Sequence, residues 1–387
     1  MANDLTFGQV SAIANEINKQ ATGSSALAVV DTSSFVTVGQ TILATGYDNV
    51  MNAISQVLDR TVFSIRPYDA KFKDIFYDEQ RWGNHVRKLS PIDLPVENDD
   101  RVPLTDGVSV DQYSVRKPQV LQTNFYGQES FSDHYTVFRD QLDVAFSGPD
   151  ELARFWTMVT QNVSDRLEQT RENLARATVA NFIGGKNSAN NGVVKLLTEY
   201  NTETGLELTA QTVKQPENYP AFVQWVYARI ASLASMLTER TNMYQINITN
   251  KTINRHTPYR NMRVYLTAQD QYSIGARVLA DIYHDNYLRL AKTGTVNFWQ
   301  SAQSPTSITV TPSVLQPAGT VTKVAQQEID NIFGVIFDEE AIGISLMNQW
   351  MSNTPFNARG GYYNVWYHET RKYWNDFTEK GIVLLME

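Results

Sequence analysis

The chain has 387 residues, of which 42% are hydrophobic and 11% aromatic, so it carries enough apolar material for the cores of roughly two or three domains. Lysine and arginine number 33 against 41 aspartates and glutamates, and the resulting net charge of -8 excludes a polycation built to wrap nucleic acid. The absence of cysteine excludes disulfides, thiolate metal sites and a cysteine nucleophile.

The first part of the chain, up to about residue 48, is expected to be a loosely tethered arm. A short amphipathic stretch, Leu5–Ile17, leads into a Gly/Ser segment at 21–25 and then a run rich in Val, Thr, Ser and Gly that ends at Gly46. From Val50 onward, apolar residues recur at helical spacing, which predicts a short helix. The first residues, Met1–Leu5, lack the basic segment and apolar run expected of a secretory signal, and no stretch approaches the roughly 18 apolar residues of a membrane span.

Residues 67–122 are polar, with isolated aromatics and scattered prolines. No helical stripe persists there, and Asp106-Gly107 is a turn signal between two extended runs. The segment has too few apolar residues for a core of its own. It is therefore predicted to be a long two-stranded excursion that needs another surface to lie on.

The strongest local signal is a helix start at residues 147–151. Ser147 supplies a cap, Pro149 suits the first helical turn, and the acids at 150 and 151 favour the helix dipole. Apolar residues then mark one face of a helix, and the glycines at 184 and 185 are expected to end it. A helix over about 150–183 is a rod of roughly 50 Å, which we interpret as a structural spine.

The rest of the chain alternates helix and strand patterns. Helices are expected at Tyr219–Arg240 and Gln269–Leu290, and residues 301–316 suit an edge strand or loop. Strand-like runs occur at 244–248, 262–266, 332–337, 341–346, 362–368 and 381–385. Strands that bracket helices in this way predict an α+β fold.

No complete catalytic motif is found. His368-Glu369 begins like the helix of a zinc protease, but Lys372 stands where the second histidine is needed, and the surrounding pattern is that of a strand. Residues 184–188 have a passing likeness to a phosphate loop, but they follow a helix instead of opening one. They are better interpreted as a helix stop.

Three small charged clusters each allow two interpretations. Asp281, His284 and Asp285 could hold a metal or form hydrogen bonds at the surface. The carboxylates at 338–340 could act as a pair, although a solvated turn is the simpler interpretation. Arginines at 255, 260 and 263, interleaved with aromatics, could contact nucleic acid, but the acidic chain favours a solvated or subunit-contacting surface.

Two segments resemble those of a known family. Residues 126–132, Tyr-Gly-Gln-Glu-Ser-Phe-Ser, and the Leu-Asp-Val-Ala-Phe run at 142–146 are similar to the segment that leads into the spine helix in short-tailed, phi29-like phages. Residues 357–368 are similar to that group's Asn-Pro-Arg-Gly stretch followed by tyrosines, a tryptophan or tyrosine, and histidine, with Ala358 standing in place of the proline. With its ordered layout from about Val50 onward, the chain resembles a major capsid protein of tailed bacteriophages.

The resemblance implies an α+β fold of the Johnson, or Hong Kong, type. It assigns residues 1–66 to an N-terminal arm and short helix, 67–122 to an extended E-loop, and 123–216 to a peripheral (P) domain with its spine helix at about 150–183. Residues 217–343 would form an axial (A) domain, and residues 344–387 would be C-terminal strands that return to the P domain.

The implied function is self-assembly into the icosahedral shell that encloses the double-stranded DNA genome of a tailed bacteriophage, without catalysis, cofactor or metal. The expected partners are copies of the chain itself as pentamers and hexamers, a scaffolding protein, a portal, and packaged DNA held by weak non-specific contact. No membrane partner is expected. The protein is expected in the virion capsid after assembly in the host cytoplasm.

The excursion supplies the candidate contacts between subunits. A two-stranded ribbon is marginal alone, so we expect it to become stable by lying across a neighbouring copy. The candidate contact residues are its charged and aromatic side chains: Tyr77, Arg81, Trp82, Arg87, Lys88, Asp99, Asp100 and Arg101.

Two other functions stay open at this point. A tail or connector subunit also needs extended arms and would form rings of a small fixed number. An enzyme would need a polar pocket that gathers Asp281, His284, Asp285 or His368.

Overall fold

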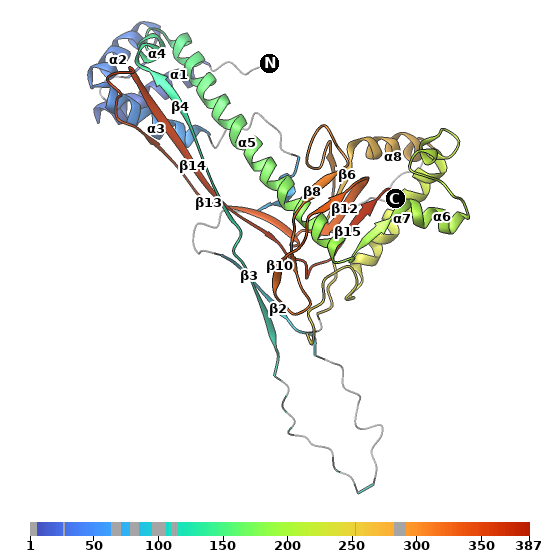
Figure 1. Cartoon of the computed structure of the whole chain (residues 1–387). Helices are drawn as coiled ribbons and strands as arrows, with labels where there is room; N and C mark the ends of the chain where they lie inside the picture. The colour runs from blue at the N-terminus through green and yellow to red at the C-terminus, as the bar shows by residue number, and fades with distance from the viewer. Residues whose placement is uncertain are drawn as a thin grey trace.

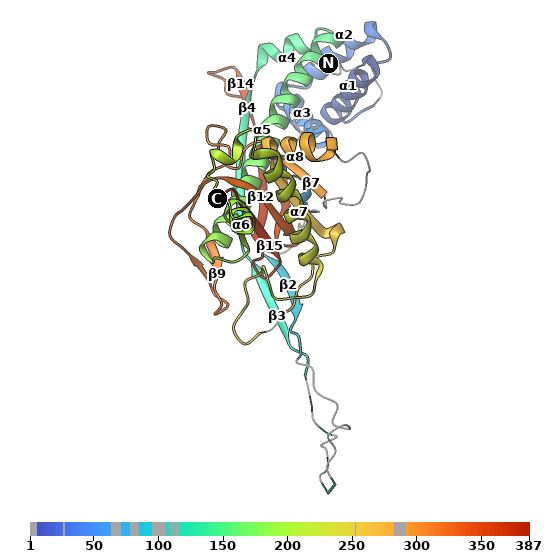
Figure 2. The same cartoon turned by 90° about the vertical axis from the view of Figure 1, so that its right-hand side faces the viewer.

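The computed structural model describes residues 6–25, 28–62, 71–77, 85–94, 117–251, 253–281 and 292–387, together with positions 106, 107, 109, 113 and 115. One long helix, α5, runs from a helical end of the molecule to a second part built of helices around a sheet (Figure 1). A two-stranded ribbon projects away from both parts (Figures 1 and 2). The predicted α+β fold is confirmed.

Helix α5 spans Pro149–Ser188 and is 40 residues long, which confirms the predicted spine. The prediction that Gly184 and Gly185 end the helix is wrong, because the helix continues past both. A Cβ atom on Gly184 would lie 2.5 Å from a methyl carbon of Val310, and one on Gly185 would lie 2.4 Å from the ring of Phe377. These glycines therefore allow other elements to pack closely against the helix.

A four-stranded sheet lies along α5, in the order β1 (Phe76–Tyr77), β13 (Ile342–Asn353), β14 (Tyr362–Asn375), β4 (Gln128–Phe138). Strand β14 pairs antiparallel with both β13 and β4, and β1 runs parallel to β13. Alternate residues of β14, such as Val365 and Tyr367, are buried, whereas their neighbours are only partly buried. One face of the sheet therefore packs toward α5, and the other faces outward.

Four helices pack at the N-terminal end of α5: α1 (Phe7–Thr22), α2 (Thr32–Ala44), α3 (Tyr47–Val62) and α4 (Arg139–Ala145). The predicted short helix after residue 48 is confirmed as α3, but the expectation of a loose arm before it is wrong. Ile17 of α1, Phe35 of α2 and Trp156 of α5 belong to one buried apolar cluster. The apolar residues of α1 and α2 recur at helical spacing, and their burial in this cluster stabilises the two helices.

The second part of the molecule is a five-stranded sheet in the order β5 (Val193–Lys195), β15 (Gly381–Leu385), β12 (Ile332–Asp338), β6 (Met262–Thr267), β7 (Lys292–Val296). The C-terminal half of α5 packs into the apolar core on one face of the sheet, and α7 (Tyr219–Thr238) packs into the core on the other. Because helices cover both faces, β12 and β15 are buried along their whole length. Helices α6 (Leu196–Thr204) and α8 (Ala268–Asp281) complete this part.

Several predictions about this region are confirmed and others need correction. The helix starting at Tyr219 and the strands near 262, 332 and 381 form as predicted. Residues 244–248 are not a strand, and Tyr244 has a φ of 62°, which an extended strand does not allow. The helix expected over Gln269–Leu290 ends within the described residues at Asp281, and positions 282–290 lie outside them.

The expected division near residues 216 and 343 does not follow the observed sheets. Strand β5 precedes the first of these boundaries and β15 follows the second, yet both pair within the five-stranded sheet. Of the strands in 344–387 that were expected to return to the P domain, β14 pairs with β4 and β15 pairs with β5, both from residues 123–216, and β15 also pairs with β12. The run Gly381–Leu385 is buried throughout, which suits a sheet covered on both faces.

The remaining described elements are short. They are the 3₁₀ turns Lys73–Ile75, Thr212–Lys214 and Tyr259–Asn261, and two small antiparallel pairs, β8 (Ile308–Val310) with β11 (Gln327–Ile329) and β9 (Ser313–Leu315) with β10 (Val321–Lys323).

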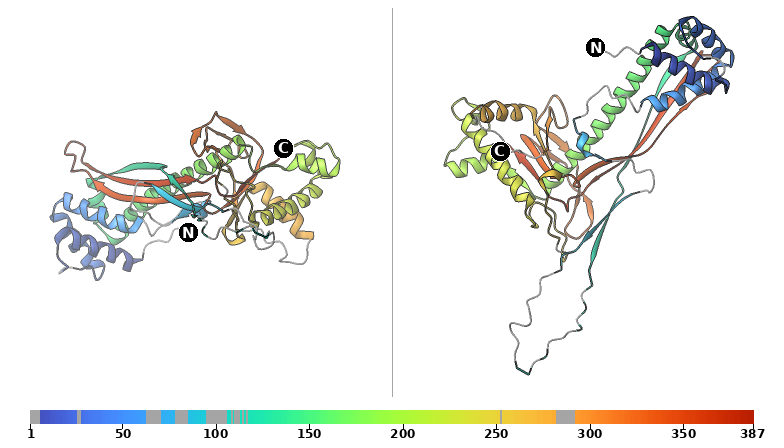
Figure 3. Two further views of the ribbon diagram at one scale, coloured as in Figure 1. Left: turned by 90° about the horizontal axis from the view of Figure 1, so that it is seen from below. Right: turned by 180° about the vertical axis from the view of Figure 1, so that it is seen from behind.

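The projecting ribbon consists of β2 (Val86–Pro91) and β3 (Val120–Phe125). The two strands pair antiparallel from Val86 opposite Phe125 to Pro91 opposite Val120. Seen from behind, the ribbon points away from the helical end (Figure 3). The predicted two-stranded excursion is thus confirmed at its base.

Candidate assembly site

The ribbon has two unlike faces, because side chains alternate along each strand. Lys88 and Ser90 lie on the face toward the body of the molecule, and Ser90 is buried. Arg87, Leu89 and Pro91 lie on the opposite face and are exposed. Val120 is directly opposite Pro91, so it extends this outer face on β3, and both Leu89 and Val120 are 57% exposed.

Lys88 fastens the inner face to residues from the end of the chain. Its ammonium nitrogen lies 2.9 Å from a carboxylate oxygen of Asp376, 2.5 Å from Glu379 and 2.8 Å from Glu340. Asp376 and Glu379 are almost fully buried, and the Lys88 side chain is only 18% exposed. Burial disfavours the charged ammonium, but the negative charges of Asp376 and Glu379 outweigh it and raise the pKa of Lys88.

Further contacts fix the direction in which the ribbon leaves the body. The Arg255 guanidinium donates to the Ser90 hydroxyl at 2.7 Å and also lies 3.2 Å from Glu379. Asp93, just beyond β2, accepts the backbone N–H of Asn254 at 2.7 Å and forms an ion pair with Arg240. The base of the ribbon is therefore held by several charged contacts at once.

The eight predicted contact residues fall into three groups. Tyr77 lies in β1, where its hydroxyl donates to the Glu339 carbonyl and its ring is 5.2 Å from Trp374, so it binds its own chain, as Lys88 does. Arg87 is exposed on the outer face of the ribbon. Arg81, Trp82, Asp99, Asp100 and Arg101 lie outside the described residues.

The outward face of the four-stranded sheet carries a row of stacked rings. His134 of β4 stacks on Trp366 of β14 at 4.4 Å, and His368 of β14 stacks on Trp350 of β13 at 3.9 Å. Trp350 is 47% exposed. The positions that share this face from Phe138 to Ser130 are uncharged serine, threonine, asparagine and aromatic residues: Ser130, Ser132, Thr136, Phe138, Asn348, Ser352, Tyr362, Asn364 and Thr370. Lys372, which follows Thr370 on the same face, is buried.

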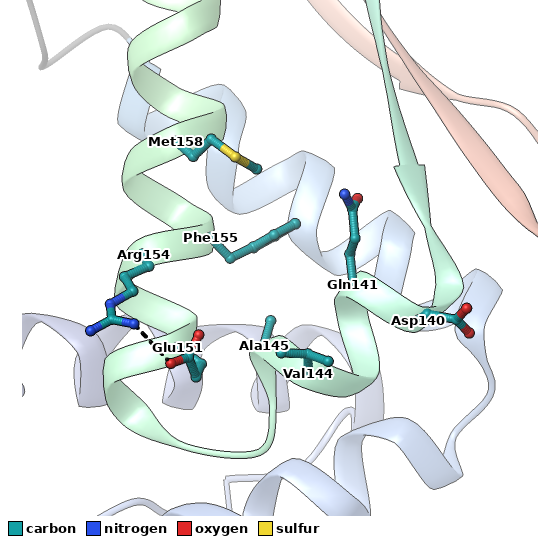
Figure 4. A pocket seen from close by; sticks show the side chains of 8 residues that line it. All are labelled: Asp140, Gln141, Val144, Ala145, Glu151, Arg154, Phe155 and Met158. Atoms are coloured by element: carbon teal, nitrogen blue, oxygen red, sulfur yellow. Dashed lines mark hydrogen bonds and ion pairs between the residues drawn. The ribbon is translucent and has the colours of Figure 1, made fainter.

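A surface groove of about 380 Å³ lies between α4 and the first turns of α5 (Figure 4). Val144 and Met158 are exposed along it, and Phe155 lies between the two helices. Arg154 and Glu151 form an exposed ion pair at its rim, 3.1 Å apart. The groove is open and mostly apolar, which is typical of a contact surface.

Of the candidate catalytic residues, the structure describes two, which lie on different elements. His368 lies on the outward sheet face, Asp281 ends α8, and His284 and Asp285 lie outside the described residues. Among the described residues, no group of three His, Asp or Glu side chains could hold a metal ion. Within the same residues, no helix is long and apolar enough to cross a membrane.

Two of the three charged clusters noted in the sequence lie within the described residues, and most of their side chains form ion pairs inside the chain. The interpretation of residues 338–340 as a solvated turn is correct for Glu340, which is exposed in a turn, and wrong for Asp338, which is buried at the end of β12. Glu339 is 2.7 Å from Arg263, Glu340 pairs with Lys88, and Asp338 is buried, which raises the pKa of its carboxyl. Arg255 forms an ion pair with Glu379, and Arg263 forms one with Glu339. Two of the three arginines that could contact nucleic acid therefore bind carboxylates of their own chain.

The residues that hold the ribbon were not found from the sequence. Asp376 and Glu379 are almost 290 residues from Lys88, and no local pattern links them. The only signal in the sequence is that these two acidic residues stand close to the strand-like run at 381–385.

Comparison with protein families matches residues 10–384 to the family described as Phi29-like phage major capsid protein. Among solved structures, the chain is similar to one in the capsid structure of Staphylococcus phage Andhra, at 9% identity and a TM-score of 0.57, covering 84% of this chain and 86% of that one. It is also similar to a chain in the structure of head fiber and inner core protein gp22 of native bacteriophage P68, at 11% identity and a TM-score of 0.56, covering 82% and 85%. A comparison with curated protein sequences found no match.

The family match spans nearly the whole chain, and the two structural neighbours share its fold. The predicted resemblance is therefore confirmed. This chain belongs to the Phi29-like phage major capsid protein family, and it forms the shell of a phage virion by assembling with copies of itself.

Proposed function

We propose that the outer face of the β2–β3 ribbon is the surface by which one subunit lies on the next, in a closed icosahedral shell of pentamers and hexamers. The observation that carries this proposal is the contrast between the two ribbon faces. The inner face is bound to the subunit's own carboxylates through Lys88, whereas Leu89 and Val120 on the outer face are exposed. Exposed apolar side chains on a fixed projection favour contact with a partner.

In this proposal, residues 67–122 are the E-loop, the four-stranded sheet with α5 is the P domain, and the five-stranded sheet with α7 is the A domain. The ion pairs of Lys88 hold the E-loop in one direction before assembly. A pre-oriented ribbon loses less entropy when it docks than a freely moving one, so each contact gains affinity without added area. Many such contacts, each weak, add up across the closed shell.

Arg87 is the proposed charged contact on the outer face, and Arg81, Trp82, Asp99, Asp100 and Arg101 are proposed contacts elsewhere in residues 67–122. Tyr77 and Lys88 are proposed to act on assembly through the position of the ribbon, because both bind their own chain. Some residues thus set the direction of the ribbon, and others contact the neighbouring subunit.

The proposed contents of the shell are double-stranded DNA held by weak, non-specific contact. The net charge of -8 supports this, because a strongly basic protein would bind packaged phosphates tightly. The outward face of the four-stranded sheet, whose lysine at 372 is buried, also offers phosphates no strong attraction. A scaffolding protein and a portal are proposed partners in assembly, and no catalytic role is proposed.

Electron microscopy and sedimentation of the concentrated, purified chain test this proposal. We expect closed shells or curved sheets with five- and six-fold clusters. Rings with one small fixed number of subunits under all salt and crowding conditions would instead support a connector subunit and contradict the proposal. Arg87→Ala and Leu89→Ser should raise the protein concentration needed for assembly, while the exposed variant Gln211→Ala, far from the ribbon, should not.

A further inference from the structure

The groove between α4 and the first turns of α5 combines apolar side chains with charges on both of its sides. Phe155 is buried between the two helices, whereas Val144 and Met158 beside it are exposed. Figure 4 shows Arg154 on one side of these apolar side chains and Asp140 on the other. The groove therefore has an exposed guanidinium on α5 and an exposed carboxylate on α4, with apolar surface between them.

Both of these charged groups can bind a further partner. The Arg154 side chain is 77% exposed and donates to Glu151 through Nη1. A guanidinium has five N–H donors, so others remain for a second carboxylate. Asp140 is exposed and forms no ion pair within the described part of the chain, because the neighbouring Arg139 lies closer to Asp143. Each side of the groove is therefore open to a group of opposite charge from another molecule.

These charges make the groove complementary to the same groove in a second copy of the chain. A half-turn about an axis that runs along the groove, in the plane of contact, exchanges its two sides (Figure 4). Arg154 of each copy then faces Asp140 of the other, and the apolar side chains meet between the two ion pairs. A contact of this symmetric kind makes each interaction twice. An apolar centre with a polar rim is the usual arrangement of protein interfaces.

We propose that this groove is a two-fold contact between two copies of the chain, in which Val144 of each copy packs against Phe155 and Met158 of the other. The inference rests on the proposed function of the ribbon. A ribbon that contacts the next subunit closes a ring, and a shell needs a second contact that joins one ring to another. The groove lies at the helical end of the molecule, and the ribbon points away from that end (Figure 3). One subunit can therefore use both contacts.

Charge reversal tests the two ion pairs. Arg154→Asp and Asp140→Arg each place like charges opposite one another, so either variant alone should raise the protein concentration needed for closed shells about tenfold or more. In an equal mixture, one variant presents two acids and the other presents two bases, so every mixed pair regains opposite charges. Closed shells should therefore return in the mixture. Both substitutions change exposed side chains, and the denaturant midpoints of the unassembled variants should stay close to that of the wild type.

Cysteine cross-linking locates the contact, because the chain has no cysteine of its own. Val144 lies close to the proposed two-fold axis, so Val144→Cys should give covalent dimers with a short bismaleimide. Tyr272→Cys is the control, since Tyr272 is 70% exposed on α8, in the other part of the molecule. It should give far less of the dimer.

The proposal is overturned if either charge-reversal variant alone forms shells as the wild type does, or if the mixture assembles no better than its components. It is also overturned if Val144→Cys gives no more covalent dimer than Tyr272→Cys. Five- and six-fold clusters without the dimer contradict the groove contact alone. The dimer without such clusters contradicts the ribbon contact alone.

Discussion

The ammonium of Lys88 lies 2.5 Å from the carboxylate of Glu379, although 291 residues separate the two in the chain. Lys88 is near the start of the projecting ribbon, and Glu379 lies two residues before β15, the last strand in the chain. The first and last thirds of the chain are thus joined at the point where the ribbon begins. The direction of the ribbon therefore depends on the folded body rather than on the ribbon's own sequence.

Replacing Lys88 should show that this residue fixes the direction of the ribbon, whereas Arg87 is available to contact the neighbouring subunit. Lys88→Met leaves Asp376 and Glu379 buried without their main counter-ion, so we expect the free energy of unfolding to fall by about 3 kcal/mol. Arg87→Met, one residue earlier on the exposed face, is the matched control and should change stability by less than about 0.5 kcal/mol. Urea unfolding of the unassembled chain measures both; equal effects would contradict the assigned roles.

A second buried charge network joins the spine to β14. The Glu369 carboxylate is 1% exposed and accepts from both Nε and Nη2 of Arg171, at 3.2 and 3.1 Å, and it also pairs with Arg371. Glu369→Gln removes the charge that pairs with the buried Arg371 and the partly buried Arg171, and we expect the free energy of unfolding to fall by about 3–5 kcal/mol.

Glu151→Gln is the control for that network, since Glu151 forms an exposed ion pair with Arg154 at the start of the same helix. It should cost less than about 1 kcal/mol. The two variants are compared by their denaturant midpoints. A loss from Glu369→Gln no larger than that from Glu151→Gln would show that the buried network contributes little.

Two glycines in helices should respond oppositely to alanine. Gly185→Ala should destabilise the chain by roughly 1–3 kcal/mol, because the new Cβ would lie 2.4 Å from the Phe377 ring. Gly8→Ala in α1 meets no atom within 4 Å and should stabilise the chain by about 0.5 kcal/mol. Thermal unfolding of both variants checks the sign of each effect, and a stabilising Gly185→Ala would refute the close packing at the end of the spine.

Lys186 should give the stability of the fold a distinct pH dependence. Burial lowers the pKa of Lys186 to about 7, against 10.5 in an unfolded chain, although the negative charge of Asp376 opposes part of the shift. Between these two pH values the unfolded chain holds a proton that the folded chain lacks. The contribution of Lys186 to the free energy of unfolding therefore rises from pH 7 toward pH 10.5.

Lys186→Met removes this titration. As the pH is raised from 6.5 to 9.5, the free energy of unfolding of the wild type should therefore rise relative to that of the variant. Loss of the hydrogen bond from Lys186 to the Tyr244 carbonyl, 2.7 Å long, adds an offset that does not depend on this titration. Denaturant midpoints at several pH values measure the difference. Parallel curves for the two proteins would mean that Lys186 keeps an ordinary pKa.

Local sequence signals predicted the regular elements well where one physical cause dominates. The start of α5 follows from Pro149 and the acids behind it, and the buried strands β12 and β15 follow from continuous apolar runs. Helix α2 was missed because its small and β-branched residues, Thr32–Ala44, suggest an extended arm, whereas burial of Phe35 and Val38 decides the outcome.

Long-range contacts explain the other failures. The pair of Lys88 with Glu379 and the close approach of Phe377 to Gly185 depend on how distant segments meet, which no window of sequence contains. The same limit applies to the candidate contacts, since sequence alone could not tell that Lys88 faces the body and Arg87 faces outward. That distinction needed the register of β2 on β3.

Shortening the ribbon tests the account of assembly most directly. Residues 95–116, which include the proposed contacts Asp99, Asp100 and Arg101, are replaced by Asn-Gly, and Arg87→Ala and Leu89→Ser remove the contacts on the outer face. Leu94 stays in register with Lys117, and the pairing of β2 with β3 and the Lys88 contacts stay intact. The account predicts a variant that unfolds with the same denaturant midpoint as the wild type but gives no shells in electron micrographs at concentrations where the wild type assembles. Shells of normal form and yield from this variant would contradict it.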